Sequence, residues 1–543
     1  MYNTDTIHLS MLCFLYVHNT VFEVIISNFS AKSNATNPLL GRKSAIILCQ
    51  FNKSYYLCAI KKTFNMEQVQ DIIIGREAEI KHLDAIVSSK EAEFVVVYGR
   101  RRVGKTFLVN TYFDDKYTFK LTGLAKKGKR EQLANFVTSL NRYANGRKFT
   151  KPRTWYEAFD KLRDLLESVQ TDGKRVVFID ELPWMDSRGG NLVSALEHFW
   201  NDWAVTQNDI VLIVCGSATS WMTKKILKNR GGLHNRVTQK LYIRPFTLAE
   251  CKKYLDSRGI LMEDKEIAEC YMIMGGIPFY LKNIRRGASL SQNVDEMFFA
   301  EKGRLDDEFN ALYASLFDKS ENYIKVISAL SSKNRGLTRD ELIKATNMES
   351  SGDFTTILQD LIDCDFIRCY HSYGNKSKMG IYQLIDPFSL FYYKFIKKYG
   401  GTDKPFWQYQ IGTRLHDTWA GLAFEQLCLN HHRQIEQALG IAGVITNVYS
   451  WSTPKAAEEK VQIDLIIKRA DKVVNVCEMK FYDGDYSMKK KDYDDMERRV
   501  RAFRAANNVR MAIHPVLVTT FGLADNQYSS IFQNTVTLKD LFK

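Results

Sequence analysis

Short apolar runs alternate along much of the chain with longer stretches in which apolar residues recur every three or four positions. Three runs have the length and composition of buried strands: FVVVY (94–98), RVVFIDE (175–181) and DIVLIVCGS (209–217). The stretches before and between them are amphipathic and predict helices, the first with Ile80, Leu83, Ile86 and Val87 on one face. Strands that alternate with helices predict a parallel sheet covered on both faces. We therefore expect an α/β core over residues 66–245.

The pattern changes after this core. Residues 246–318 read as helices only and predict a helical lid domain. Residues 319–386 give three helices followed by two strand-like pieces, which is the order of a winged-helix domain. Residues 387–543 open with an aromatic helix and continue with apolar strands, which indicates a separate α/β domain. Residues 1–65 show no sustained period, and we interpret them as an upstream extension, with Met66 as the natural start.

Composition narrows the class of protein. With 543 residues, 45% of them hydrophobic, the chain can build several cores. The ten cysteines form no C-x-x-C pair with histidines at metal spacing, so we expect a reducing cytoplasm and no zinc site. The N-terminal apolar stretch is interrupted by His18, Asn19 and Glu23, so we expect no signal peptide and no membrane span. The net charge of +14 is compatible with a polyanionic partner and equally with a merely basic face.

A glycine-bounded loop follows the first buried strand and leads into a helix. Its sequence, GRRRVGKT (99–106), fits the phosphate-loop pattern G-x-x-x-x-G-K-[ST] in the expected strand–loop–helix context. In such loops backbone N–H groups surround the phosphates, Lys105 reaches the β and γ phosphates, and the Thr106 hydroxyl is a Mg²⁺ ligand. The residues expected to contact ATP are Gly99, Arg100, Arg101, Arg102, Val103, Gly104, Lys105, Thr106 and Phe107.

Acids follow the second strand at its carboxyl end. Asp180 is expected to hold Mg²⁺, and Glu181 to act as the base that orients the attacking water; helix capping by the two acids is the alternative. Ser217 ends the third strand and is expected to sense the γ phosphate, although a plain strand-end serine explains it nearly as well. Arg236 is a candidate arginine finger acting in trans, with an exposed surface arginine as the even alternative.

These motifs together resemble the prokaryotic, archaeal-type ATPase family of the AAA/STAND group of P-loop proteins. VYGRRRVGKT, FIDELPW, CGS and MGGIP occur in the family's order, after a GREAE-type box at Ile74, Gly75, Arg76 and Glu77. The resemblance implies that Gly75 and Arg76 belong to the nucleotide site and that Gly275, Gly276 and Pro278 lie near the adenine. It also implies a nucleotide-driven conformational switch or a slow ATPase, and it leaves a homo-oligomer open. Asn235 replaces the glycine that the family places before Arg236.

The C-terminal region carries a second group of chemically active residues. Asp464 lies on one apolar strand, and Glu478 and Lys480 share a face of the next, with a short turn between the strands. Two carboxylates can bind Mg²⁺ while the lysine positions a water. The pattern resembles the PD-(D/E)-x-K nuclease core, a restriction-endonuclease-like domain that the ATPase family often carries, and the resemblance adds Glu425 from a preceding helix. A degenerate nuclease fold with an exposed Lys/Glu pair is the alternative of about equal weight.

Two features bear on nucleic acid. The helix predicted over SMKKKDYDDMERRVRAFR is rich in lysine and arginine, but a solvated helix face is the commoner explanation. The third helix of the winged-helix region carries Asp353, Asp360, Asp363 and Asp365, which would repel phosphates if exposed, so a structural or protein-contact role is favoured. We therefore expect an ATP- and Mg²⁺-dependent ATPase switch. An ATP-regulated DNA endonuclease and a protein-binding signalling switch stay open as alternatives.

Overall fold

The structure is a computed structural model that describes residues 73–543, apart from residues 188, 229, 230, 234, 318, 372, 375–379, 402–404 and 454–458. These residues form one compact unit, Ile73–Lys543. The extension expected over residues 1–65 lies outside the described residues.

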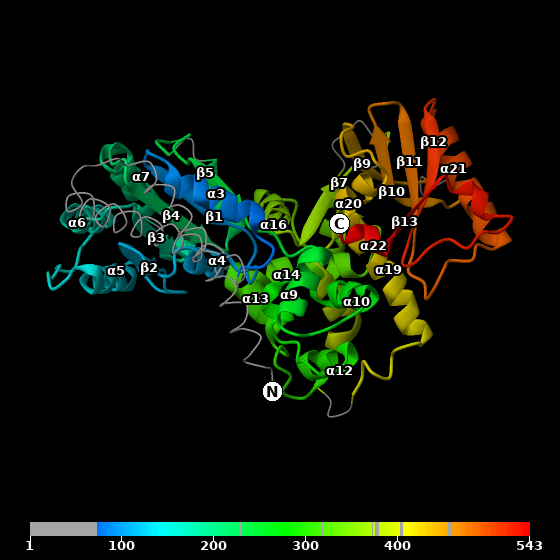
Figure 1. The fold of residues 1–543 in the computed structure, drawn as a ribbon, viewed down its shortest axis with the longest axis horizontal. Helices are drawn as coiled ribbons and strands as arrows, with labels where there is room; N and C mark the ends of the chain where they lie inside the picture. Colours follow the sequence, from blue (N-terminus) through cyan, green and yellow to red (C-terminus); the bar gives the residue numbers. More distant parts are fainter. Residues whose placement is uncertain are drawn as a thin grey trace, which may run out of the picture. The chain divides into compact units, whose positions relative to one another are not determined.

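A five-stranded parallel sheet forms the first part of the unit, with the strand order β2-β3-β4-β1-β5 (Figure 1). Its three central strands are β1 (Glu93–Tyr98), β3 (Arg175–Asp180) and β4 (Ile210–Gly216). They coincide with the three apolar runs of the sequence, so the predicted parallel sheet is confirmed. The edge strands β2 (Phe119–Thr122) and β5 (Gln239–Tyr242) were not predicted, because four-residue strands with polar positions form no apolar run.

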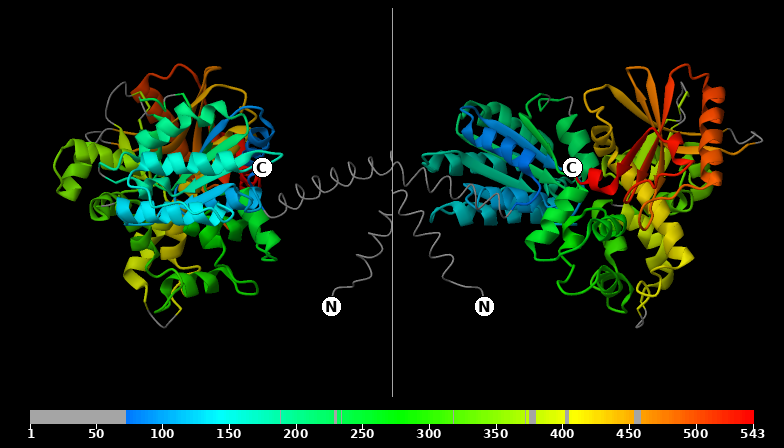
Figure 2. Two further views of the ribbon diagram at one scale, coloured as in Figure 1. Left: turned by 90° about the vertical axis from the view of Figure 1, so that its left-hand side faces the viewer. Right: turned by 45° about the vertical axis from the view of Figure 1, so that its right-hand side comes forward.

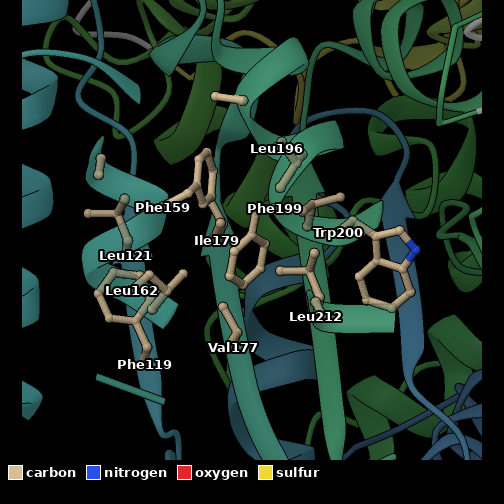
Figure 3. Close-up of a cluster of buried hydrophobic side chains, with 14 of the residues drawn as sticks. Phe119, Leu121, Phe159, Leu162, Val177, Ile179, Leu196, Phe199, Trp200 and Leu212 are labelled. Carbon is tan, nitrogen blue, oxygen red and sulfur yellow. The ribbon is translucent and has the colours of Figure 1, made fainter. Parts of the chain in front are cut away.

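Helices cover both faces of this sheet. The helices of the region are α3 (Glu77–Ser88), α4 (Lys105–Tyr112), α5 (Lys129–Tyr143), α6 (Trp155–Ser168) and α7 (Leu192–Asp202). Alternate residues of the strands, such as Val177 and Leu212, pack with Phe159 of α6 and Trp200 of α7 in one apolar cluster (Figure 3). The intervening strand residues are buried as well, which requires cover on the opposite face.

The sheet is followed by helices, as the sequence pattern predicts. The short α8 (Thr219–Trp221) and a π-helical segment (Met222–Leu227) lie between β4 and β5. The helices after β5 are α9 (Leu248–Ser257), α10 (Asp264–Met274), α11 (Pro278–Leu281), α12 (Leu290–Val294), a second π-helical segment (Asp295–Phe299) and α13 (Glu308–Leu316). The next region holds α14 (Ser320–Ser331), α15 (Arg339–Thr346) and α16 (Gly352–Asp363), with β6 (Leu337–Thr338), β7 (Ile367–Tyr370) and β8 (Ile381–Leu384). These three strands form an antiparallel sheet in the order β6-β8-β7.

Helix α16 is docked on the first part of the unit through its acidic side chains. Asp360 accepts from Lys224 at 2.7 Å and from the hydroxyl of Tyr323 at 2.8 Å. Asp365, just beyond the helix, is hydrogen-bonded by the hydroxyl of Tyr242 on β5. Asp363 accepts from Gln359 at 2.8 Å, so three of the four acids that the sequence shows on this segment are used in internal contacts.

The C-terminal part begins with α17 (Pro387–Phe391), a π-helical segment (Tyr392–Ile396) and α18 (Lys397–Tyr399), then α19 (Arg414–Asn430) and α20 (His432–Ala438). A second five-stranded sheet follows, in the order β13-β12-β11-β10-β9 (orange to red in Figure 2). Its strands are β9 (Thr446–Ser452), β10 (Gln462–Arg469), β11 (Val473–Lys480), β12 (Ala512–Thr519) and β13 (Asn534–Thr537), flanked by α21 (Lys490–Asn507) and α22 (Leu538–Leu541). The β9–β10 and β10–β11 pairs are antiparallel and the others parallel. Among the helices described, none is long and apolar enough to cross a membrane.

Candidate functional site

The glycine-rich loop leaves β1 and enters α4 at the carboxyl edge of the parallel sheet. Lys105, the first residue of α4, is buried and turns back over the loop, where its Nζ donates to the carbonyl oxygens of Gly99 at 3.0 Å and Arg100 at 2.9 Å. The N-terminus of α4 leaves backbone N–H groups free of intrahelical partners, a geometry that favours anions. The loop therefore offers an ammonium group and backbone donors at one place.

Two features of the backbone hold the loop in this shape. Gly99 has φ 139°, and a Cβ there would lie 2.3 Å from the carbonyl oxygen of Ile243, so no other residue fits without moving the chain. Arg76, buried under Phe246, donates to the carbonyl oxygens of Val103 at 3.1 Å and Arg244 at 2.8 Å. Burial lowers the pKa of Arg76. Arg76 thus ties the loop to the segment that follows β5.

Thr106 and Asp180 are brought together. The Thr106 hydroxyl donates to Oδ2 of Asp180 at 2.8 Å, and Asp180 is 3% exposed at the end of β3. A hydroxyl and a carboxylate oxygen are hard ligands of the type that Mg²⁺ prefers, and the nearby loop would bring phosphate oxygens. These residues fit a Mg²⁺ ion bound with a nucleotide.

Glu181 and Ser217 are also brought together, although separate roles were predicted for them. Glu181 has a left-handed backbone (φ 49°), and its carboxylate accepts from the Ser217 hydroxyl at 2.6 Å and from the Ser217 backbone N–H at 3.2 Å. Non-glycine residues in this conformation are uncommon and concentrate at functional sites. Ser217 therefore fixes the orientation of the Glu181 carboxylate in this structure.

The three loop arginines are held by contacts outside the loop. Arg100 forms an ion pair with Asp386 at 2.7 Å, and their side chains are 3% and 0% exposed. Arg102 pairs with Glu308 at 2.7 Å and lies over the ring of Phe279.

Further contacts around Glu308 and Arg101 join the loop to neighbouring segments. Glu308 accepts from the hydroxyl of Tyr280, and its pKa is raised by burial, an effect that Arg102 opposes. Arg101 lies over the ring of Trp184 and is half-buried, and its pKa is lowered by burial and then by Arg102. Sequence reasoning missed Asp386 and Glu308, since no motif links them to the loop.

The glycines outside the loop lie in tight turns. A Cβ at Gly75 would meet the side chain of Glu250, and Gly276 would place one 2.2 Å from the carbonyl oxygen of Phe246. Gly275 ends α10 in the left-handed conformation, next to Pro387 at the start of α17. Pro278 is the first residue of α11.

Two of the residues predicted for the nucleotide site, Arg236 and Phe107, have exposed side chains. Arg236 is exposed in the turn before β5, and Phe107 is 55% exposed on α4.

A second group of residues gathers at the C-terminal sheet. Glu478 and Lys480 share one face of β11 and pair at 2.7 Å, and Arg499 of α21 binds the other oxygen of Glu478. Asp464 on β10 lies one position beyond the ladder pair Leu465–Cys477, opposite Glu478, and accepts from Gln462 at 2.5 Å. Glu425 comes from α19, which packs on β11.

The carboxylates of this group influence one another. Burial raises the pKa of Glu425 to about 8, with further contributions from Asp464 and Glu478. Burial likewise raises the pKa of Asp464. Within the described ranges, no three His, Cys, Asp or Glu side chains are arranged to hold a metal ion. Arg499, which the sequence indicated only as a cation of a charged helix, forms an ion pair with Glu478 in this structure, as Lys480 does.

Comparison with known proteins places the first part of the chain in a family. Residues 73–284 match the model of the ATPase domain predominantly from Archaea. An uncharacterized protein of Methanocaldococcus jannaschii is 27% identical over 327 residues, which are 60% of this chain and 69% of that protein. An uncharacterized ATP-binding protein of the same organism is 33% identical over 45 residues, which are 8% of this chain and 76% of that protein.

Two solved structures are also similar. The Walker-type ATPase of Pyrococcus abyssi has a TM-score of 0.44 and 17% identity, covering 60% of this chain and 96% of that one. The ORC2 protein of Aeropyrum pernix has a TM-score of 0.37 and 15% identity, covering 58% of this chain and 90% of that one. These scores are low, and the family match carries the assignment. Residues 73–284 therefore form a P-loop ATPase domain of the archaeal type, with homologues in an archaeon.

Proposed function

We propose that this protein is a Mg²⁺-dependent ATPase that acts as a nucleotide-driven switch coupled to its C-terminal domain. The observation that carries the proposal is the buried ion pair between Arg100 and Asp386. Arg100 belongs to the loop that would surround the phosphates, and Asp386 precedes the helix that leads into the C-terminal part. A change at the loop therefore has a direct mechanical partner outside the ATPase domain.

The residues of the loop and of the neighbouring strand ends would have separate roles in hydrolysis. Lys105 would leave its two carbonyl partners and bind the β and γ phosphates, while Thr106 and Asp180 hold the metal. A bound Mg²⁺ ion supplies positive charge that offsets the charge developing on the transferred phosphoryl group. Glu181 would orient the attacking water, with its carboxylate fixed by Ser217. Arg236 would serve an adjacent copy in trans if the protein oligomerises, and the Gly275–Pro278 turn would flank the adenine.

The proposed transmission runs through α17. Asp386 caps this helix, since its Oδ2 accepts from the backbone N–H of Ser389 at 2.9 Å and from the Ser389 hydroxyl at 2.6 Å. Loss or rotation of the Arg100 contact would therefore disturb the first turn of α17. The pair between Arg102 and Glu308 gives the helices after the sheet a second contact with the same loop.

The other domain assignments support this arrangement and remain part of the proposal. Three helices with a three-stranded antiparallel sheet over residues 319–386 favour a winged-helix domain. A mixed sheet that carries Asp464 on β10 and Glu478 and Lys480 on β11, with Glu425 on the adjoining α19, favours a restriction-endonuclease-like domain. Residues 246–318 would form the lid that reads the nucleotide state.

Hydrolysis and coupling are tested separately. Phosphate release from Mg-ATP is measured for the wild type and for Lys105→Ala and Glu181→Gln. Hydrogen exchange of α17 is then followed with and without a non-hydrolysable ATP analogue. The proposal requires hydrolysis that both variants lose, and nucleotide-dependent exchange at α17 that Asp386→Asn abolishes. Exchange that does not respond to nucleotide in an active wild type would reject the coupling.

A metal-dependent DNA endonuclease regulated by the ATPase is the second candidate. The position of Asp464 opposite Glu478, with Lys480 on the same face of β11, favours it, although Lys480 and Arg499 both bind Glu478 in this structure. Supercoiled, linear and single-stranded DNA are incubated with Mg²⁺ or Mn²⁺, with Glu478→Ala/Lys480→Ala as the control. Cleavage lost in the control, and retained in Lys105→Ala, supports the nuclease; an inert domain under every metal supports a switch that binds a protein partner.

A further inference from the structure

A large cavity lies between the C-terminal sheet and the three-helix region, by which we mean residues 319–386 with α14, α15 and α16. It measures about 860 Å³, and its walls come from the end of α14, from β8, α17 and α19, from the start of β10 and from α21. Glu425 and Asp464 line it, whereas Glu478 and Lys480 line a separate small pocket with Arg499, which borders both. Two of the carboxylates of the candidate nuclease-like site, those of Glu425 and Asp464, therefore line a cavity that the three-helix region also borders.

The segment between α14 and β6 forms a basic wall of this cavity. Lys333 and Arg335 are exposed in the segment between α14 and β6, and Lys394 joins them from the π-helical segment after α17. Lys460 and Arg498 also line the cavity beside β10, where Arg498 is paired with Asp495 at 2.8 Å. Arg335 also lines a second cavity, of about 120 Å³, together with Asp464, so the basic wall reaches the carboxylates themselves. Such a wall favours a ligand with repeated negative charges.

The floor of the cavity is apolar and carries one polar group without a partner. Leu330, Trp419 and Leu429 line it. Gln426, the neighbour of Glu425 on α19, lines it too, is 8% exposed, and its buried Oε1 lacks a hydrogen-bond partner in the structure. A buried amide oxygen without a donor is costly, so a ligand that offers an N–H group would be stabilised here.

We propose that this cavity binds single-stranded nucleic acid, with phosphates on Lys333, Arg335 and Lys394 and bases over the apolar floor. Apolar contact and a base N–H donor to Gln426 match the chemistry by which proteins hold single strands. A cavity of about 860 Å³ is in the range of pockets that enclose a drug-sized molecule, and it holds a few nucleotides. A double helix, whose major groove alone is roughly 12 Å wide, does not fit inside it.

This inference gives the three-helix region a nucleic-acid contact that avoids its third helix. Asp360 of α16 is engaged with Lys224, and Asp365 with Tyr242, so that helix faces the ATPase domain. The segment with Lys333 and Arg335 faces the cavity instead. The inference deepens the proposed function and rests on it only for the expectation that Glu425 and Asp464 act on the bound strand.

Binding is measured with the full chain by fluorescence anisotropy, in EDTA and without ATP, so that no cleavage interferes. The probes are labelled 12-nucleotide deoxythymidine and uridine oligomers and a DNA duplex of the same length. The variant is Lys333→Ala/Arg335→Ala, and the matched control is Lys148→Ala/Lys151→Ala, two exposed lysines between α5 and α6. Thermal melting checks that both variants fold as the wild type does.

The expected result is that the single strands bind more tightly than the duplex. The cavity variant should bind them at least 10-fold more weakly, and the slope of log K against log salt should fall by about 1.4, or about 0.7 for each lost phosphate contact. The control should keep the wild-type affinity and slope. Gln426→Met should weaken binding to the base-bearing strand and leave an abasic strand unaffected. The deoxy and ribo probes tell DNA from RNA.

Tighter binding of the duplex, an unchanged slope in the cavity variant, or an equal loss in the control would overturn the inference. The result is separable from the proposed function. Binding by this cavity without any metal-dependent cleavage leaves the inference standing and removes the nuclease. Cleavage that Lys333→Ala/Arg335→Ala does not affect, with unchanged binding, leaves the nuclease standing and removes the inference.

Discussion

Arg100 of the phosphate loop and Asp386 at the start of α17 form a 2.7 Å ion pair from which water is almost fully excluded. Arg100 also lies over the ring of Phe366, and Asp386 keeps a second oxygen for Ser389. A buried charge is tolerated only when it is paired and hydrogen-bonded. The loop and the start of the C-terminal part are therefore constrained to move together or to separate at a high energetic cost.

The first prediction concerns this pair. Asp386→Ala leaves the Arg100 charge buried and unpaired, so the free energy of unfolding should fall by about 3–5 kcal/mol. Arg100→Met/Asp386→Leu, which removes both charges, should recover most of that loss. Chemical denaturation measures all three proteins. A double variant no more stable than Asp386→Ala would show that the charge is not the cause.

The second prediction separates nucleotide binding from hydrolysis. Lys105→Ala removes the ammonium group from the loop, so ATP affinity measured by calorimetry should fall by 10-fold or more, about 1.4 kcal/mol or greater. Glu181→Gln keeps the loop intact, so it should bind ATP normally and hydrolyse it roughly 10²–10⁴-fold more slowly. Unchanged ATP affinity in Lys105→Ala would contradict the site.

The third prediction assigns Ser217 to positioning. Its hydroxyl holds the Glu181 carboxylate at 2.6 Å, so Ser217→Ala should lower kcat and leave KM for ATP unchanged. Ser217→Thr keeps the hydroxyl and should restore most of the rate. A Ser217→Ala variant with weaker ATP affinity and normal kcat would indicate contact with the phosphate instead.

The fourth prediction is a pH dependence of stability through His431. This buried imidazole donates from Nδ1 to the carbonyl oxygen of Leu427, and its Nε2 accepts from the backbone N–H of Leu248. Burial, opposed by the bond to Leu427 and aided by the nearby His432, lowers its pKa from 6.5 to about 4. The unfolded chain therefore binds the proton first, so the stability present above pH 6.5 is lost as the pH falls toward 4.

Between pH 7 and 5, protonation of His431 in the unfolded chain should lower the free energy of unfolding by about 2 kcal/mol. Denaturation curves at both values should show the loss, and His431→Gln should reduce it by that amount. His82→Gln, at an exposed position of α3, is the matched control. An equal pH slope in wild type and His431→Gln would contradict the assignment.

The fifth prediction concerns the turn at Gly276. A Cβ there would lie 2.2 Å from the carbonyl oxygen of Phe246, and φ is 65°, so Gly276→Ala should cost more than about 1 kcal/mol of stability. Gly173→Ala is the control, because its Cβ would meet nothing within 4 Å. Thermal melting compares the two, and equal melting temperatures would show that the turn relaxes freely.

The parallel sheet and the phosphate loop were predictable because their signals are local. Buried strands such as FVVVY are uninterrupted apolar runs, and Lys105 stands at a fixed distance from Gly99. The strands β2 and β5 escaped because sheet edges of four residues carry polar side chains, and tertiary pairing rather than composition makes them strands.

The partners of the loop arginines were not predictable. Asp386 read only as the residue before an aromatic helix, and Glu308 as one acid in a helical stretch. Only the folded chain brings these carboxylates to the loop. The sequence also could not name the partner of Asp360 on α16, because Lys224 lies 136 positions earlier in the chain and only folding brings the two together.

Arg100 pairs with Asp386 and Arg102 with Glu308, so the loop that would bind the nucleotide is also held by carboxylates outside the ATPase domain. Under the proposed switch, nucleotide and the C-terminal part compete for a single loop conformation, and thermodynamic linkage makes that competition reciprocal. A macromolecule that draws α17 away from the loop would change the affinity for ATP by the same factor by which ATP changes the affinity for that macromolecule. The dissociation constant for ATP would then change when a macromolecule binds to the C-terminal part of the chain.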